Sequence, residues 1–227
     1  MLMALLKIAI SVALLWVLFA HIDAGAVLAQ VTQARLVPLL AALAALLVLA
    51  VVQAYRWVVV LRAIGGRLGL KQAWLNVMIG LFFNQTLPST IGGDAVRIWR
   101  AHKVGLDLRR AVNGVMIDRL AALLALLLFV LVCLPELHAL IGDGAVFWAM
   151  PAVVVAGFVA CAALLILDKL PSSFMRWRIV AGFARFSADA RRTLLDRRYG
   201  PAVVAISLLL QISVSSSVWL IAIGLHL

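Results

Sequence analysis

The chain of 227 residues is 66% hydrophobic and only 13% charged, and its mean hydropathy is +1.15. Soluble domains are about half apolar and about a quarter charged, so this composition excludes an ordinary water-soluble domain. The net charge of +11 would favour nucleic-acid binding in a soluble protein. Here the basic residues lie between long apolar segments, where Lys and Arg set membrane orientation and contact anionic headgroups. We therefore expect membrane lipids as partners and no nucleic acid.

Five apolar segments are long enough to cross a membrane as helices, which takes about 20 residues each. They cover approximately residues 3–20, 36–61, 112–134, 145–167 and 202–225. Each segment is apolar on all sides, unlike a helix at the surface of a soluble protein. The sequence therefore predicts an all-α, polytopic transmembrane helix bundle with about five full spans, in a single membrane domain over residues 1–227.

The first predicted span has a second interpretation as a secretion signal. Lys7 precedes an apolar stretch, and residues 24–26 (Ala-Gly-Ala) loosely resemble a cleavage site. An uncleaved span is the simpler interpretation, because the chain that follows is itself embedded in a membrane. We therefore expect the first apolar segment to stay in the protein as a span.

The connecting segments differ in charge. Segments 62–72, 97–110 and 168–200 contain most of the Lys and Arg residues, whereas segment 135–144 contains two acidic residues and no Lys or Arg. The positive-inside rule assigns the three basic segments to the cytoplasm and segment 135–144 to the outside. This pattern predicts a multi-pass protein of a bacterial-type inner membrane with a cytoplasmic N-terminus.

The apolar stretch 73–88 lies between two basic segments, so a full crossing would leave one of them outside. As a helix it reaches only about 22 Å, which is too short to cross, and it carries three amide side chains. We predict a re-entrant helical hairpin over about residues 73–103 that turns at about 88–93 and returns from about Asp94. Irregular backbone at membrane depth requires burial in protein or a wet cavity. An interfacial helix that lies flat is the alternative.

The longest polar connection, residues 168–200, alternates aromatic and apolar residues with arginines. This pattern is typical of an amphipathic helix that lies at a membrane interface and contacts anionic lipid. We therefore predict a basic amphipathic segment on the cytoplasmic side. A solvated loop with incidental aromatic residues is the alternative.

The turn between the two predicted half-helices contains the most informative residues of the chain. Pro88 ends the preceding helix, and Ser89 or Thr90 can cap the following one. Gly92 and Gly93 permit unusual backbone dihedral angles and the close approach of another group. The start of the second half-helix would offer free N–H groups and the positive end of its dipole to an anion.

Two arginines follow the glycine pair at helical spacing. They would add cationic donors suited to a phosphate or a carboxylate. The predicted lipid headgroup site consists of Gly92, Gly93, Arg97 and Arg100. In the structural alternative, the glycine pair only permits close helix contact, and Asp94 caps its own helix or pairs with Arg97.

Other ionisable residues lie within or near the apolar segments. A charge at mid-bilayer costs on the order of 2.5–3.5 kcal/mol on insertion scales, so we expect Asp118 to pair with an arginine of another helix. We expect Arg56 to extend its charge to the membrane interface, with pairing as the alternative. The predicted cavity or structural polar residues are Asn84, Pro88, Asp94, Asp118, Arg119 and Arg56.

No catalytic motif is visible. The sequence contains no phosphate-binding loop, no zinc-protease or nucleophile-elbow motif, and no Cys/His cluster. Cys133 and Cys161 lie in separate apolar segments and are expected to be inert packing residues. We therefore expect no metal, no cofactor and no enzymatic activity.

Three short segments carry a family resemblance. They are residues 80–84 (Gly-Leu-Phe-Phe-Asn), 87–97 (Leu-Pro-Ser-Thr-Ile-Gly-Gly-Asp-Ala-Val-Arg) and 117–120 (Ile-Asp-Arg-Leu). With Tyr-Arg-Trp at 55–57 and His-Ile-Asp at 21–23, they resemble the flippase-like membrane family, which is related to the transmembrane domain of lysylphosphatidylglycerol synthases. The resemblance covers nearly the whole chain. It implies an integral inner-membrane protein that binds or translocates lipids, with some relatives in glycolipid or hopanoid pathways.

The chain departs from this family in two ways. Lysylphosphatidylglycerol synthases carry aminoacyl transfer in a soluble C-terminal domain, and no segment here matches that domain. Family members also usually continue into further spans with a second Gly-Gly segment, whereas this sequence ends at Leu227, inside or just after a predicted span. We therefore expect a short family member or a fragment of a longer protein.

Two functions are consistent with these features. The first is a protein that binds and translocates (flips) an anionic lipid or a lipid-linked intermediate, because the glycine-containing turn and its basic flank suit a headgroup. The second is a non-transporting scaffold or partner of a lipid-modifying enzyme in an aminoacyl-phospholipid, glycolipid or hopanoid pathway. The unmatched transferase domain motivates this second function.

Overall fold

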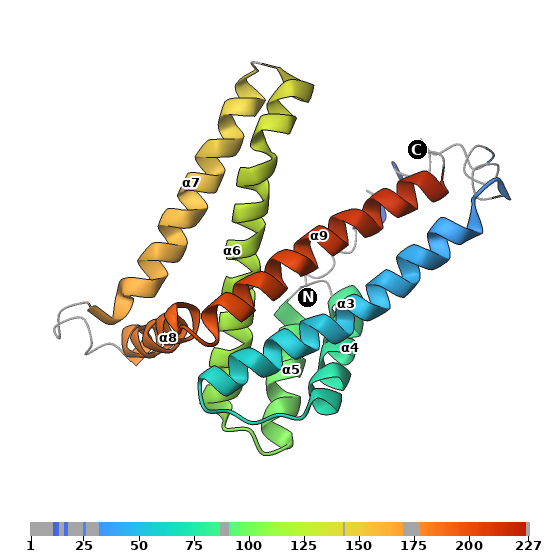
Figure 1. The fold of residues 1–227 in the computed structure, drawn as a ribbon. Helices are drawn as coiled ribbons and strands as arrows, with labels where there is room; N and C mark the ends of the chain where they lie inside the picture. The colour runs from blue at the N-terminus through green and yellow to red at the C-terminus, as the bar shows by residue number, and fades with distance from the viewer. Residues whose placement is uncertain are drawn as a thin grey trace. The chain divides into compact units, whose positions relative to one another are not determined.

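The computed structural model describes residues 11–13, 16–17, 25, 32–86, 91–142, 144–169 and 178–225. Every regular element in these residues is a helix, which confirms the predicted all-α class for this part of the chain (Figure 1). The helices described along their whole length are α3 (Leu36–Ala63), α4 (Leu70–Thr86), α5 (Ile91–Lys103), α6 (Leu108–Ile141), α7 (Ala145–Ile166), the short 3-10 helix η1 (Leu167–Lys169), α8 (Arg178–Leu195) and α9 (Gly200–Gly224).

Four of the described helices are long and apolar enough to cross a membrane. These candidate spans are Leu36–Ala63, Leu108–Leu140, Trp148–Lys169 and Gly200–Gly224. They correspond to the second to fifth predicted spans. Most of the first predicted span, residues 3–20, lies outside the described residues, so the number of five spans stays a prediction.

Helix α6 is longer at both ends than the predicted span 112–134. It continues through Pro135 to Ile141, so most of the predicted connection 135–144 is helical, and where the span ends within α6 stays a prediction. Helices embedded in apolar surroundings tolerate an internal proline, and the residues that follow it are mostly good helix formers. The helix ends at Gly142, whose φ of +72° suits glycine.

The chain divides into two compact units, residues 1–44 with 217–227 and residues 45–216. In the first unit, the start of α3 packs against the end of α9. The Arg35 N–H donates to the Gly224 carbonyl oxygen at 2.8 Å, and a Cβ added at Gly224 would lie 2.9 Å from a leucine side chain of α3. A larger residue at position 224 would therefore require this leucine side chain to shift.

The core of the second unit consists of two apolar clusters that both include residues of α3. The first cluster packs α3 against α4, α5 and α6 and contains the fully buried Trp57 and Leu61. The second cluster packs Val59 and Val60 against α6, α7, α8 and α9. Gly114 lets α6 approach α3, because a Cβ there would lie 2.5 Å from Leu61 Cδ2. Since helices cover α3 on more than one side here, polar groups in this stretch are buried too.

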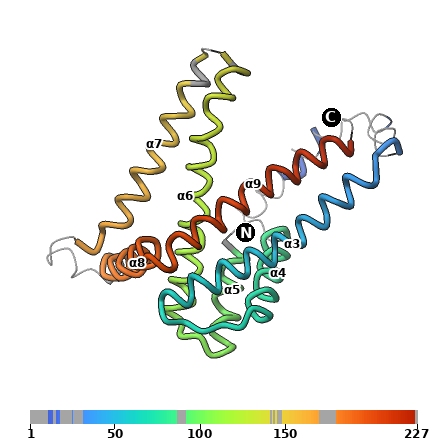
Figure 2. The backbone as a smooth tube through the Cα atoms, in the orientation of Figure 1, coloured from blue at the N-terminus to red at the C-terminus, as the bar shows by residue number. Residues whose placement is uncertain are grey.

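Helices α4 and α5 pack side by side as a helical hairpin, with bounds close to the predicted 73–103 (Figure 2). Helix α5 begins at Ile91, about three residues earlier than predicted, so Gly92 and Gly93 lie in its first turn. Pro88 and its immediate neighbours lie outside the described residues. Entry of this hairpin into a membrane stays a prediction.

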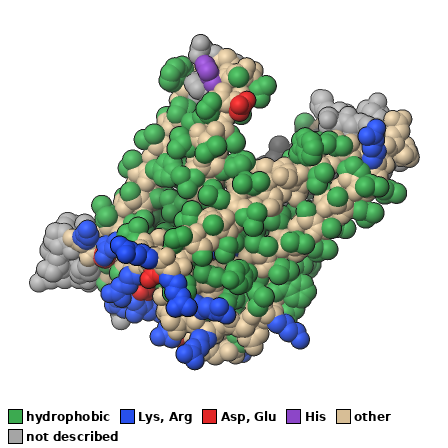
Figure 3. Space-filling view, in the orientation of Figure 1, with side chains coloured by type: hydrophobic (Ala, Val, Ile, Leu, Met, Phe, Trp, Pro, Cys, Tyr) green, Lys and Arg blue, Asp and Glu red, His purple; other side chains and the backbone are tan. Residues whose placement is uncertain are grey.

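The predicted amphipathic segment 168–200 contains η1 and α8, and residues 170–177 lie outside the described part. On α8, Phe186 is buried whereas Arg185 and Arg192 are exposed, so the described helix is amphipathic as predicted. Figure 3 shows Lys and Arg side chains gathered over α8 and the neighbouring end of α6, while hydrophobic side chains cover the length of α6 and α7. Contact of this basic surface with anionic lipid stays a prediction.

Candidate functional site

The second unit contains a connected set of ion pairs that we call the ionic cluster. Its members are Arg56 of α3, Asp94 and Arg97 of α5, and Asp118 and Arg119 of α6. All five were expected from the sequence to be cavity, structural or headgroup residues. The fold therefore brings together polar residues that lie far apart in the chain.

Asp118 lies at the buried end of the ionic cluster. Its Oδ1 accepts a hydrogen bond from Arg56 Nε at 2.8 Å, and its Oδ2 lies 3.4 Å from Arg97 Nη2. Asp118, Arg56 and Arg97 are 1%, 4% and 2% exposed. The predicted pairing of Asp118 with an arginine of another helix is confirmed, and the carboxylate has two such partners.

The prediction that Arg56 extends to the membrane interface is wrong. Its guanidinium is buried, and its Nη1 donates to Ser207 Oγ of α9 at 3.0 Å. An arginine side chain extends to the membrane interface when it has no partner inside the protein. Arg56 does have a partner, because the carboxylate of Asp118 on α6 lies opposite it. A buried charge next to a partner is much less costly than an unpaired one, so pairing is favoured.

Asp94 and Arg119 form the more accessible end of the ionic cluster. Arg119 donates from Nε and Nη2 to the two carboxylate oxygens of Asp94 at 2.8 and 2.7 Å, which is a bidentate geometry. Arg97 Nη1 lies 3.5 Å from Asp94 Oδ1, which confirms the alternative of an i, i+3 pair. The side chains of Asp94 and Arg119 are 20% and 45% exposed. The ionic cluster therefore runs from a buried end to an end that a ligand can reach.

The ionic cluster carries more positive than negative charge. Its three guanidinium groups face two carboxylates, which leaves an excess of one positive charge. Three buried N–H donors also have no acceptor among the described residues, namely Arg97 Nε, Trp57 Nε1 and Asn76 Nδ2. A buried donor without a partner costs about 1–3 kcal/mol. The chemistry of the site therefore suits a further anionic, acceptor-rich group.

Packing contacts hold the side chain of Arg97 in addition to its ion pairs. Its Cζ lies 4.5 Å from the centroid of the Trp57 ring, a cation–π contact. Its aliphatic stem passes over Gly80 of α4, where an added Cβ would lie 2.8 Å from Arg97 Cδ. Arg97 is therefore held between α3 and α4 as well as beside α6.

Gly93 and Asn84 join the two helices of the hairpin. The Gly93 N–H donates to Asn84 Oδ1 at 3.0 Å. A Cβ added at Gly93 would lie 2.2 Å from the Gly80 carbonyl oxygen and 2.3 Å from Asn84 Oδ1. Close helix contact, the structural alternative, is therefore present at Gly93, and the amide predicted to meet a headgroup already has an acceptor.

The remaining predicted headgroup residues lie outside the ionic cluster. Arg100 is half-buried and donates from Nε to Asn76 Oδ1 of α4 at 2.8 Å. Gly92 is half-buried in the first turn of α5, and Pro88 lies outside the described residues. Binding of a headgroup by Gly92, Gly93, Arg97 and Arg100 stays a prediction.

Three residues that complete the site were not predicted from the sequence. Gly80 and Ser207 interrupt otherwise apolar segments, and such interruptions are a usable signal for a helix contact or a polar partner. Trp57 has no signal beyond its position next to Arg56, because its contact with Arg97 depends on how α3 and α5 pack.

Comparison with known families gives one match. The family model for the lysylphosphatidylglycerol synthase TM region matches residues 4–227 of the chain. The matched range includes every described helix and all five residues of the ionic cluster. No curated protein and no solved structure matches the chain significantly.

Proposed function

The chain belongs to the family of the lysylphosphatidylglycerol synthase transmembrane region, and from this premise we propose that it binds an anionic lipid or lipid-linked intermediate at the ionic cluster and translocates it across the membrane. Its four candidate spans make it a multi-pass membrane protein. The family resemblance leads us to assign it to a bacterial inner membrane, and the positive-inside rule leads us to place its N-terminus and basic segments in the cytoplasm.

The observation that carries this proposal is the excess positive charge of the ionic cluster. Two of the helices that form the cluster, α3 and α6, are apolar enough to span a membrane, where an unpaired charge is costly. A lipid phosphate supplies both the missing negative charge and several acceptor oxygens. The buried donors of Arg97 and Trp57 are of the kind that such oxygens satisfy.

The route into the cluster begins at Arg119, its most exposed member. Arg119 binds Asp94 with two parallel hydrogen bonds, and a guanidinium binds phosphate with the same geometry. In the proposed exchange, the phosphate replaces Asp94 on Arg119 and then on Arg97. Each guanidinium then keeps a negative partner throughout, which avoids the penalty of several kcal/mol for an unpaired buried ion. This exchange lets a charged headgroup pass through apolar surroundings.

We further propose that the hairpin of α4 and α5 re-enters the membrane from its cytoplasmic side. The two helices have 17 and 13 residues. At about 1.5 Å per residue both are shorter than the hydrocarbon core of about 30 Å. A hairpin that returns to its starting side also keeps the basic segments 62–72 and 97–110 together. The ionic cluster would then lie within the membrane, at the inner face of the hairpin.

We expect Arg119→Gln to slow lipid translocation at least about tenfold, because a hydrogen bond to a charged group contributes about 1.5–3 kcal/mol. The full chain is reconstituted in phosphatidylcholine vesicles that contain a small fraction of phosphatidylglycerol with a fluorescent acyl chain. Translocation is measured as the fraction of fluorescence that becomes accessible to an external membrane-impermeant quencher over time.

Arg67→Gln provides the matched control, because it removes the same charge from an exposed site in the connection between α3 and α4. It is expected to translocate at the wild-type rate. Equal rates for wild type, Arg119→Gln and protein-free vesicles would contradict translocation. Co-purification of a lipid-modifying enzyme together with that result would favour the scaffold function instead.

A further inference from the structure

A separate pocket of about 390 Å³ lies between α6 and α8. Its lining includes Arg109, Val112 and Met116 of α6 and Phe183, Arg185 and Phe186 of α8. None of these residues belongs to the ionic cluster, and the proposed translocation does not use them. The pocket therefore requires its own explanation.

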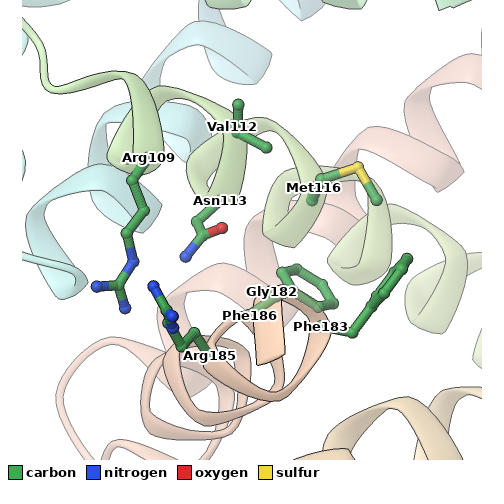
Figure 4. Close-up of a pocket in the computed structure, with 8 residues that line it drawn as sticks. All are labelled: Arg109, Val112, Asn113, Met116, Gly182, Phe183, Arg185 and Phe186. Carbon is green, nitrogen blue, oxygen red and sulfur yellow. The ribbon is translucent and has the colours of Figure 1, made fainter. Parts of the chain in front are cut away.

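The pocket has a cationic end and an apolar end. Figure 4 shows the guanidinium groups of Arg109 and Arg185 next to each other at one end, and Met116 with the phenylalanine rings at the other. Phe183 is 47% exposed and Met116 44% exposed, so the apolar end opens to the surroundings of the protein. A ligand that fits both ends must carry a negative group and an apolar chain.

The charges at the cationic end are only partly balanced. Arg109 Nη2 lies 3.5 Å from Asp189 Oδ2, and the same oxygen accepts a hydrogen bond from Asn113 Nδ2 at 2.6 Å. Arg185 has no carboxylate partner within the described ranges. Two guanidinium groups and one carboxylate leave one positive charge, and the two arginines repel each other unless an anion lies between them.

The place of the pocket along α6 suggests that it lies at the level of lipid headgroups. Arg109 is the second residue of α6, at the start of a candidate span, and the apolar lining follows one to two turns further along that helix. Helix α8 is amphipathic and carries the basic surface seen in Figure 3. The cationic end therefore lies at the boundary between polar and apolar surroundings, where lipid phosphates lie.

We propose that this pocket binds an anionic phospholipid of the surrounding membrane. Its phosphate lies between Arg109 and Arg185, and the first part of an acyl chain lies over Phe183 and Met116. The phospholipid joins α8 to α6 and covers apolar surface that the two helices leave exposed. This binding does not depend on translocation at the ionic cluster.

The proposal is tested with phosphatidylglycerol that carries a photoactivatable diazirine in its acyl chain. The full-length protein is placed in phosphatidylcholine nanodiscs with a small fraction of this lipid, and cross-linked peptides are identified by mass spectrometry. We expect cross-links in α6 near Met116 and in α8 near Phe183. Arg185→Gln is expected to reduce them about fivefold, the factor that one basic side chain near an anionic lipid surface contributes.

Arg197→Gln is the control, because Arg197 is exposed in the connection between α8 and α9 and its replacement removes the same charge. It is expected to leave the cross-links at both positions unchanged, as is an excess of inorganic phosphate. An equal loss with Arg197→Gln would overturn the proposal in favour of diffuse attraction to a basic surface. Displacement by inorganic phosphate would overturn it in favour of a site for free anions. Unlabelled phosphatidylcholine that competes as well as phosphatidylglycerol would also overturn it.

Cross-links of the same lipid to α5 report on the ionic cluster separately. Arg185→Gln is expected to leave these unchanged, while Arg119→Gln is expected to reduce them and to spare those at Phe183. Loss of the α8 cross-links in both variants would contradict a site that is independent of the ionic cluster.

Discussion

Replacing Asp118 with alanine is expected to lower the free energy of unfolding by about 3–5 kcal/mol, the cost of leaving a buried charge without its partner. The carboxylate of Asp118 contacts both Arg56 and Arg97, and all three residues are almost fully buried. Without it, the hydroxyl of Ser207 is the hydrogen-bond partner that Arg56 keeps among the described residues. The measurement is an unfolding titration with sodium dodecyl sulfate, followed by circular dichroism of the protein in mild detergent.

Asp189→Ala is the control for this prediction. It also removes a carboxylate next to an arginine, but the Arg109 side chain is 56% exposed, and such pairs contribute about 0–1 kcal/mol. Asp189 also accepts a hydrogen bond from Asn113, whose loss adds about 1 kcal/mol, so the expected loss stays below that of Asp118→Ala. A double variant has leucine in place of both Arg56 and Asp118. Its loss of unfolding free energy is expected to be smaller than the sum of the losses in the two single leucine variants, because the effects of replacing contacting residues are not additive. Equal effects of Asp118→Ala and Asp189→Ala would contradict a buried ionic cluster.

Gly93→Ala is expected to separate the helices of the hairpin and to destabilise the protein by about 1–3 kcal/mol, as overpacking of a tight contact does. The added methyl group would meet the backbone oxygen of Gly80, which cannot rotate away, and the amide of Asn84. The Gly93 N–H bond to Asn84 and the position of Arg97 over Gly80 would be disturbed together. The same titration measures the stability, and the fluorescent lipid assay measures the effect on translocation.

Gly182→Ala is the matched control, because a Cβ at that position of α8 has no neighbour within 4 Å. Alanine is a better helix former than glycine by about 0.8–1.0 kcal/mol, so this variant is expected to be as stable as wild type or more stable. If Gly93→Ala behaved in the same way, the close contact between α4 and α5 would be contradicted.

The spans were predictable because a membrane helix has a single dominant requirement, a long apolar segment. The ends of the helices were less predictable than the spans, as α6 shows. Residues 135–144 were predicted as a connection, but α6 continues through Pro135, because a proline in apolar surroundings does not by itself end a helix. The start of α5 was misplaced for a related reason. The glycines that suggested a turn are tolerated in a first helical turn, and Gly93 is required for close contact with α4.

The members of the ionic cluster were predictable from the sequence, but the ion pairs that they form were not. The cost of a charge in an apolar segment implied that Asp118 had a partner, but Arg56 lies 62 positions away and Arg97 lies 21 positions away. Which arginine meets the carboxylate depends on how α3 and α5 pack on α6, and no local pattern encodes that. The wrong prediction for Arg56 has the same origin, because its distance from the end of a span does not reveal what faces it.

Ser207 is a partner of Arg56 that adds no negative charge, so the net charge of the ionic cluster stays positive. Its hydroxyl donates its one proton to the Val203 carbonyl oxygen at 2.7 Å, so towards Arg56 it acts only as an acceptor, and it brings no charge. An aspartate at this position of α9 would have matched the third arginine and made the assembly electrically neutral. With serine there, the ionic cluster keeps one excess positive charge. If the proposed lipid binding takes place at this cluster, we expect the excess charge to favour amphiphiles with negative headgroups over those with only positive headgroups.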